Sequence, residues 1–492
     1  MPLVSPDCPK SFLLVTALAA VAHLPFQEAT AASFAENPLP FNLEEPQEGE
    51  PEVPVGLQAA DDDREPGLPA GLGPAGADDG AGVDSFDRST RAFREFGGFL
   101  DLRSGSRLRD DPDEPQQSLG ELRLQLNGKI ALEWITARAV VDVVHDYLAE
   151  GQELDLDTSE GSIDLRTLDF VVSPVEFADL RIGRQALTWG VGDLLFLNDL
   201  FPKDWNAFFL GRDLEYLKAP ADVARLSLFF DDVTVDVVYG PRFNADRFLD
   251  RRRLSSFDPI AGEISGADTP LPVDRPDRWF VDDELAVRLA RTVGSWELAA
   301  YGYQGFWKSP EGFDPDLSVA LFPRLLSGGV SARGPWRKGI LSLEGASYRS
   351  IDDPGGDEPY LPNSRWLFLA GYERELTTDL IAGIQYMGTF IRQHEEYLQN
   401  LPDGTPAAAA SDHLMTLRLS WQNRAQMLRL SLFSMWGITE GDGYLRPHVS
   451  YALSDSWRLE TGANVLHGDQ PHSRFGQLER NTNLWGAVRY SF

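Results

Sequence analysis

Cysteine is almost missing from this chain, and histidine is scarce. The only cysteine is Cys8, and the chain of 492 residues has seven histidines. No two histidines have an H-x-H or H-x-x-x-H spacing, and Cys8 falls in a segment that we expect to be cleaved off. A zinc site brings three or four such ligands together. We therefore predict no metal site and no cofactor.

Basic residues are also in short supply. The chain has 44 Lys and Arg against 76 Asp and Glu, which gives a net charge of −32. Binding to nucleic acid requires a basic face that neutralises phosphates, so the sequence excludes nucleic acid as a partner. Such acidity favours a solvated surface, or one bathed in divalent cations.

Long apolar runs are missing beyond the N-terminus. Residues 11–26, SFLLVTALAAVAHLPF, follow Lys10 and precede Ala29-Thr30-Ala31. This pattern indicates an export signal peptide over residues 1–31, with a short N-terminal membrane anchor as the alternative. No later run approaches the roughly 18 apolar residues of a membrane helix. An exported chain of this kind is periplasmic, secreted or an outer-membrane barrel.

Residues 32–92 are rich in proline, glycine and acids, as in EEPQEGEPEVPVG and DDDREPGLPAGLGPAGADDG. A segment with so few apolar residues buries too little surface to offset the entropy lost on ordering. We expect a disordered periplasmic segment here. Docking of this segment to peptidoglycan or to a partner protein is the alternative.

From residue 93 onward, apolar and polar residues alternate. In GELRLQLNGKIAL, Leu122, Leu124 and Leu126 share one face, while Arg123 and Gln125 share the other. Alternation with a period of two predicts strands that are apolar on one face only. A soluble sandwich and a membrane barrel both fit this pattern, so the connections must decide between them.

We expect 18 strands, with 16 as the alternative count. Their ranges are 93–104, 119–132, 135–147, 161–173, 179–190, 219–230, 233–243, 281–291, 295–307, 320–333, 339–350, 364–374, 379–394, 412–421, 427–437, 443–453, 457–467 and 479–492. Short turns alternate with long loops at 191–218, 244–280, 351–363 and 395–411. Outer-membrane barrels have short periplasmic turns and longer outer loops. The predicted fold is therefore an all-β, antiparallel transmembrane barrel over residues 93–492.

The C-terminal sequence NLWGAVRYSF supports this fold. Leu484, Val488 and Tyr490 share a face with the terminal Phe492, whereas Arg489 lies on the other face. The segment resembles the last strand of bacterial outer-membrane barrels, which ends in an aromatic residue and is recognised by the barrel assembly machinery. The resemblance implies the outer membrane as location, with lipid and lipopolysaccharide as surroundings.

Barrel enzymes need particular residues at the rim, and we find no convincing set. A phospholipase pairs a serine with a histidine, but His145 and His394 have no well-placed serine beside them. Omptin-like proteolysis needs paired aspartates with a histidine, and Asp412-His413 is the only adjacent pair. We predict no catalytic residues and no enzymatic activity.

The stretch RIGRQALTWGVGDLLFLNDLFPKDW, residues 181–205, carries a more specific pattern. Its GRQ…WG…D…P-x-D string resembles outer-membrane barrels related to the alginate-export and capsule-assembly families. The resemblance implies a monomeric barrel with a polar lumen. The acidic excess of residues 93–492 differs from the basic pore of an alginate exporter. The candidate lumen or constriction residues on this string are Arg184, Gln185, Trp189, Asp193, Asp199 and Asp204.

Strict alternation would place Arg184 on the lipid-facing side with Leu180 and Ile182, which is costly at the bilayer midplane. One solution is a bulge at Gly183 that turns Arg184 into the lumen, toward Asp193, Asp199 and Asp204. The other is a strand with Leu187 and Trp189 facing outward. We favour the bulge.

Residues 191–218 are too apolar to remain in water. We expect them to fold inward as a constriction or plug held by acid–arginine pairs, with a loop across the barrel rim as the alternative. The predicted function is a porin-like channel or transporter for small solutes or a component of a surface polymer. The alternative function is a closed structural or binding barrel that docks an exporter or a surface polysaccharide.

Overall fold

The computed structural model describes residues 93–149, 153–258 and 261–492. The chain divides into two units, Met1–Gly73 and Pro74–Phe492, and every described residue belongs to the second. The expected signal peptide (residues 1–31) and the expected acidic segment (residues 32–92) lie outside the described residues, so both remain predictions.

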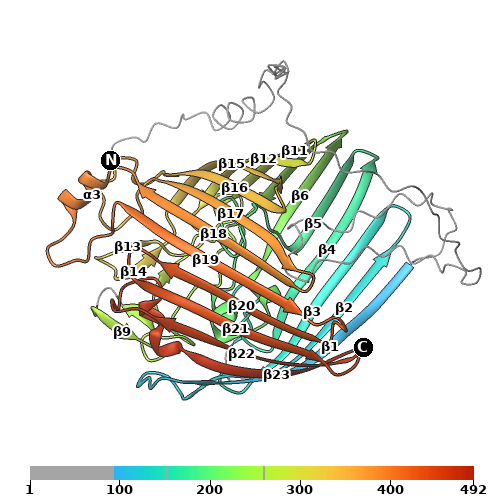
Figure 1. The fold of residues 1–492 in the computed structure, drawn as a ribbon. Coiled ribbons are helices and arrows are strands. Elements are labelled where there is room, and N and C mark those ends of the chain that lie inside the picture. Colours follow the sequence, from blue (N-terminus) through green and yellow to red (C-terminus); the bar gives the residue numbers. More distant parts are fainter. Residues whose placement is uncertain (1–92, 150–152, 259–260) are drawn as a thin grey trace, which may run out of the picture. The chain divides into compact units, whose positions relative to one another are not determined.

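Eighteen long antiparallel strands form one closed sheet (Figure 1). They are β1 (Phe93–Arg107), β2 (Gln117–Ala131), β3 (Ile135–Asp146), β4 (Ile163–Val175), β5 (Ala178–Ala186), β6 (Pro220–Phe230), β7 (Val233–Gly240), β11 (Glu284–Val293), β12 (Trp296–Phe306), β15 (Arg324–Trp336), β16 (Gly339–Ser350), β17 (Arg365–Thr377), β18 (Leu380–Ile391), β19 (Ser411–Gln422), β20 (Leu428–Gly437), β21 (Asp442–Ala452), β22 (Trp457–His467) and β23 (Asn483–Ser491).

Each of these strands pairs with its neighbours along the chain, and the ring closes between the first strand and the last. β1 pairs with β2 on one side and with β23 on the other, from Phe99 opposite Ser491 to Arg107 opposite Asn483. The predicted barrel of 18 strands is therefore confirmed, and the alternative of 16 strands is wrong.

The connections carry the remaining elements. Two small sheets consist of β8 (Ser256–Asp258) with β9 (Glu263–Ser265), and of β10 (Val273–Asp274), β14 (Val319–Leu321) and β13 (Gly312–Asp314). The helices are α2 (Trp205–Leu210), η1 (Leu214–Leu217), α3 (His394–Asn400) and η2 (Gly476–Asn481). No helix in the described part of the chain is long and apolar enough to cross a membrane.

The two ends of the barrel differ. Short turns such as the one between β6 and β7 lie at one end, which we call the inner end. The long connections that carry the small sheets and helices lie at the other, which we call the outer end.

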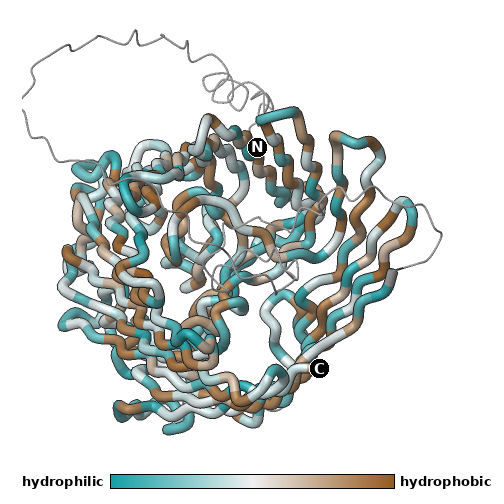
Figure 2. Tube along the Cα trace, turned by 45° about the vertical axis from the view of Figure 1, so that its right-hand side comes forward, coloured by the Kyte–Doolittle hydropathy of each residue, from teal (hydrophilic) through white to brown (hydrophobic). Residues whose placement is uncertain are grey.

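The two faces of the wall differ as the alternation predicts, and Figure 2 shows apolar and polar residues interleaved along the strands. On β23, Leu484 and Val488 are exposed on the outward face, while Arg489 is buried on the inward face. On β2, Leu122 is 43% exposed and its neighbour Arg123 is 5% exposed. The wall therefore presents apolar side chains to the surroundings and charged ones to the lumen.

Substitution of arginine for Leu124, an outward residue near the middle of β2, tests this assignment. The cost at the bilayer midplane is roughly 2–4 kcal/mol of folding free energy. Asn127→Arg on the same strand is the matched control, because Asn127 is an exposed side chain of the inward face. Urea titrations in lipid vesicles should show a large loss only for Leu124→Arg. Equal losses would mean that the faces are assigned wrongly.

Candidate functional site

The connection between β5 and β6, residues 187–219, leaves the wall and runs through the barrel. We call it the inserted segment. It contains α2 and η1, and Figure 2 shows chain inside the ring of strands. Its partners Glu344, Gln385 and Arg418 stand near the middles of β16, β18 and β19. The inserted segment therefore lies within the lumen and not merely across the rim.

The apolar side chains of the inserted segment are covered by inward-facing side chains of the wall. The buried ones are Leu187, Trp189, Leu195, Leu197, Phe201, Phe208, Phe209, Leu210 and Leu217. Trp189 packs edge-on against Phe201 with ring centroids 4.8 Å apart, and its ring lies 6.2 Å from Tyr301 of β12. Burial of each large apolar side chain contributes roughly 1.5–3 kcal/mol. The apolar side chains of the inserted segment are thus shielded from water by the inward face of the barrel wall.

Local signals set the shape of the short helix α2. Asp204 has an extended backbone, and its carboxylate accepts a hydrogen bond of 2.7 Å from the Ala207 amide, as a helix N-cap does. The helix ends at Gly211, whose φ of 94° belongs to the left-handed region. A Cβ at this position would also collide with the ring of Trp485. Both the backbone conformation and the space therefore require glycine.

The first half of the inserted segment is held by β16, β18 and β19. Glu344 accepts hydrogen bonds from the Val191 amide at 3.1 Å, from the Asn198 amide at 2.9 Å and from the Asn198 side chain at 2.8 Å. Asp193 forms an ion pair with Arg418, at 2.8 Å between Oδ1 and Nη2, and its amide donates to Gln385. This half is fixed by acceptors and charges from the middle of the wall.

The second half is held by the opposite part of the wall. Arg212 donates to Glu121 of β2 at 2.8 Å, and the Tyr216 hydroxyl donates to Asp142 of β3 at 2.7 Å. The Asp213 carboxylate lies 3.2 Å from Arg489 of β23. Burial disfavours the charged form of Asp213, but the guanidinium groups of Arg489 and of a second arginine on β1 lower its pKa.

Carbonyl groups of α2 and its C-terminus accept hydrogen bonds from the last two strands and from β1. Asn464 of β22 and Asn483 of β23 both donate to the Phe209 carbonyl, at 2.9 and 3.0 Å. Arg103 of β1 donates to the Gly211 carbonyl at 2.7 Å. The last carbonyls of a helix have no partner within it, so these contacts satisfy groups that would otherwise be buried unpaired.

The two alternatives for Arg184 both prove wrong. Pairing of β5 with β4 and with β6 continues through Gly183 without a register shift, so no bulge turns Arg184 inward. Leu187 and Trp189 do not face outward, because both are buried in the core of the inserted segment. β5 consequently ends at Ala186, where the expected strand continued to residue 190.

Arg184 stays on the side of Ile182 and avoids the bilayer midplane because it stands near the outer end of β5. Its guanidinium donates to Asp222 at 2.6 Å and to Asp157 at 3.0 Å. Its expected partners Asp193, Asp199 and Asp204 are paired elsewhere. Burial opposes ionisation of Asp157, but Arg275, Arg242 and Arg184 together lower its pKa.

The other candidate residues do meet around the inserted segment. Gln185 lies at the end of β5, where the inserted segment begins. It is fully buried and donates a hydrogen bond of 3.3 Å to the Val223 carbonyl. Asp199 accepts from Thr188 at 2.5 Å and pairs with Lys203 at 3.0 Å. Asp204 lies 3.3 Å from Arg247, which belongs to the next long connection.

The sequence does not reveal which residues of the wall and of the next long connection bind the inserted segment. Glu344, Arg418, Glu121 and Arg247 lie far away in sequence and carry no local motif. Alternation predicts that Arg123 faces the lumen. It does not predict which inward charged residue contacts which part of the inserted segment. Within the described residues, no three His, Cys, Asp or Glu side chains gather in a way that could hold a metal ion.

Replacement of Glu344 by leucine should loosen the inserted segment. It would leave the Val191 and Asn198 amides without an acceptor, and each unmade buried hydrogen bond costs roughly 1–3 kcal/mol. Tyr348→Phe is the milder comparison, because it removes only the hydrogen bond to the Leu197 carbonyl, worth roughly 0.5–1.5 kcal/mol. Urea unfolding in detergent should show the larger loss for Glu344→Leu, and a reversed order would contradict this anchoring scheme.

Comparison with known proteins places the fold among solved barrels. OccAB4 from Acinetobacter baumannii matches with a TM-score of 0.50 and 11% identity, over 83% of this chain and 100% of that one. OccK5 (OpdH) from Pseudomonas aeruginosa has a TM-score of 0.47 and 10% identity, over 81% and 98%. A Rhodopseudomonas blastica porin variant has a TM-score of 0.36 and 9% identity, over 81% and 100%.

At such low identities, this likeness concerns the fold alone. No family model matches the chain, and no curated protein matches it either. The resemblance to alginate-export and capsule-assembly barrels therefore remains a prediction. The chain forms a closed antiparallel barrel of 18 strands, and its fold is similar to that of OccAB4.

Proposed function

We propose that this protein is an outer-membrane channel for small solutes whose lumen is narrowed by the inserted segment. The observation that carries the proposal is the ionic lining of the inner half of the lumen. Arg138 and Arg181 both pair with Asp169, at 3.1 and 2.7 Å, yet their side chains stay 24% and 16% exposed. Charges that retain this exposure on the inward face indicate water inside the wall.

A second ionic group repeats the arrangement farther round the wall. Asp236 of β7 accepts from Arg225 at 3.0 Å and lies 4.0 Å from Arg288, while the two arginines stay 25% and 16% exposed. Barrels of 16–18 strands are wide enough to leave an aqueous channel. An inert barrel filled with apolar side chains would not need such a lining.

On the outer side of the inserted segment lies a cavity of about 760 Å³. Phe196, Trp205 and Phe209 form its floor, and the connections at the outer end form its sides. Under the proposal, solutes gather in this cavity and pass the inserted segment beside the ion pair of Asp193 with Arg418 of β19. The constriction would keep its conformation through the packing of Trp189 and the polar contacts of Asp199 and Asp204. Gln185 would support it from the end of β5, and the ion pairs of Arg184 would stabilise the outer end of the barrel.

The proposal includes the surroundings of the barrel. The outward apolar face suits the lipid bilayer, and the outer end would contact lipopolysaccharide. The exposed Tyr490 and Phe492 at the C-terminus suit recognition by the barrel assembly machinery. The resemblance to alginate-export-like barrels implies that the barrel is a monomer, and this is part of the proposal. No enzymatic activity is proposed.

One observation favours the alternative, a closed barrel that docks an exporter or a surface polysaccharide. The apolar core of the inserted segment extends from Leu187 to Leu217 and contacts many strands of the wall. Such a core resists displacement, so a permanently closed lumen is the competing function.

Single-channel recording separates the two functions. The wild-type barrel in a planar bilayer should show a small conductance, and deletion of residues 195–212 should raise it severalfold toward that of an open barrel. The reason is that the deletion removes α2 and most of the apolar core from the lumen. Removal of residues 395–408 is the matched control, because α3 has no buried residue, and it should leave conductance unchanged.

A silent wild type whose conductance also stays unchanged after the 195–212 deletion would refute the channel. Heat-modifiable migration on gels shows in parallel that each variant has folded.

A further inference from the structure

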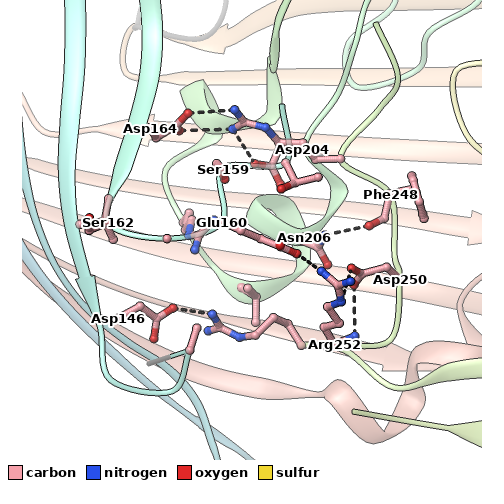
Figure 3. Close-up of a pocket in the computed structure, with 18 of the residues that line it drawn as sticks. Asp146, Ser159, Glu160, Ser162, Asp164, Asp204, Asn206, Phe248, Asp250 and Arg252 are labelled. Carbon is pink, nitrogen blue, oxygen red and sulfur yellow. Dashed lines mark hydrogen bonds and ion pairs between the residues drawn. The ribbon is translucent and has the colours of Figure 1, made fainter. Parts of the chain in front are cut away.

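A second cavity lies between the wall and the long connections at the outer end (Figure 3). Its volume is about 290 Å³ and it is partly open. Its lining comes from residues 144–149 and 158–164 at the outer ends of β3 and β4, from the inserted segment around Asn206, and from residues 246–253 of the connection after β7, together with Arg123 and Arg275. We call it the polar pocket.

The charges of the polar pocket balance. Its lining contains six carboxylates and six guanidinium groups. Arg247 bridges Asp164 at 2.8 Å and Asp204 at 3.3 Å, and Figure 3 labels both carboxylates. Arg252 joins Glu160 and Asp250.

The remaining charges also have partners. Asp146 pairs with Arg253, and Asp246 accepts hydrogen bonds from the Lys203 amide and the Trp205 ring. Arg123 pairs with Asp142 and Arg212 with Glu121, and Arg275 lies 3.6 Å from Asp157. Each carboxylate of the lining is thus paired with an arginine or hydrogen-bonded to other groups of the protein.

Three polar side-chain atoms around the pocket, two of them uncharged and one in the Arg253 guanidinium, lack such a partner in the described part of the chain. Thr158 Oγ1, Asn206 Oδ1 and Arg253 Nη2 are buried without a hydrogen-bond partner among the described residues. The hydroxyl groups of Ser159 and Ser162 belong to the same lining. Buried polar groups are nearly always paired in folded proteins, so several unmet groups around one cavity indicate hydrogen-bonding partners that enter from outside the chain.

We infer that the polar pocket binds a neutral, hydroxyl-rich solute about the size of a monosaccharide. Its volume stands at the low end of the roughly 300–1,000 Å³ typical of ligand pockets. Hydroxyl groups donate and accept, so one such solute can accept from Arg253 and donate to Asn206 and Thr158. Carboxylates and guanidinium groups that are already paired keep free lone pairs and N–H groups for further hydroxyls.

A charged solute fits less well, because it must compete for a pair that already exists. Separation of Arg247 from Asp164, for example, would leave one buried charge uncompensated, at a cost of several kcal/mol. A neutral solute avoids this cost. The apolar wall from Leu210 and Phe248 offers a surface for the C–H faces of a sugar ring.

The inference extends the proposed channel but does not require it, since binding can be measured on closed barrels in detergent. Saturation-transfer NMR with D-glucose should show transfer from the protein to the sugar ring protons. L-Glutamate and L-lysine should show none. Thr158→Val should weaken glucose binding roughly fivefold through the loss of one hydrogen bond, and Ser162→Trp, which fills the cavity, should abolish binding.

Thr292→Val is the matched control, because Thr292 lies at the inner end of β11, and it should bind glucose like the wild type. Absence of glucose transfer, stronger binding of either charged probe, or an equal effect of the two threonine variants would each overturn the inference. Conductance measured on the same preparations shows separately whether the channel exists.

Discussion

Everything in this structure depends on the closure of one backbone hydrogen-bond network. Hydrocarbon offers no partners to amide groups, so a sheet placed there must have no free edge. β1 meets this demand by pairing with both β2 and β23. Once the ring is closed, the pleat alone sorts the side chains. Leu122 then faces outward and Arg123 inward.

The interior of the barrel has two regions of different chemistry, one apolar and one ionic. At mid-height of the barrel, apolar residues of the inserted segment pack against wall residues such as Tyr301 and form an apolar core. Nearer the inner end, the two arginines that pair with the buried Asp169 stay partly exposed. The boundary runs through the contacts of Glu344 and Arg418, where a wall charge and a chain inside the lumen share hydrogen bonds. The proposed constriction coincides with this boundary.

The sequence determines the wall well because alternation is a local property. All 18 expected strands correspond to observed ones, and the faces assigned around Leu124 and Leu484 are confirmed. The alternation rule failed at Arg184, because the free-energy cost of an outward arginine depends on its depth along the strand and on its partners. One of these partners, Asp157, comes from the connection between β3 and β4. Pairings such as Glu121 with Arg212 span the whole fold. No spacing in the sequence encodes them.

The inserted segment also constrains the order in which the barrel can form. It lies between β5 and β6, yet Asn464 and Asn483 grip its Phe209 carbonyl from the last two strands. These two hydrogen bonds cannot form until β22 and β23 are in place. The inserted segment therefore has its full set of contacts only once the wall is complete. A chain truncated before β22 would lose the pairing of β1 with β23, which closes the ring. It would also lose the two asparagine side chains that bind the Phe209 carbonyl.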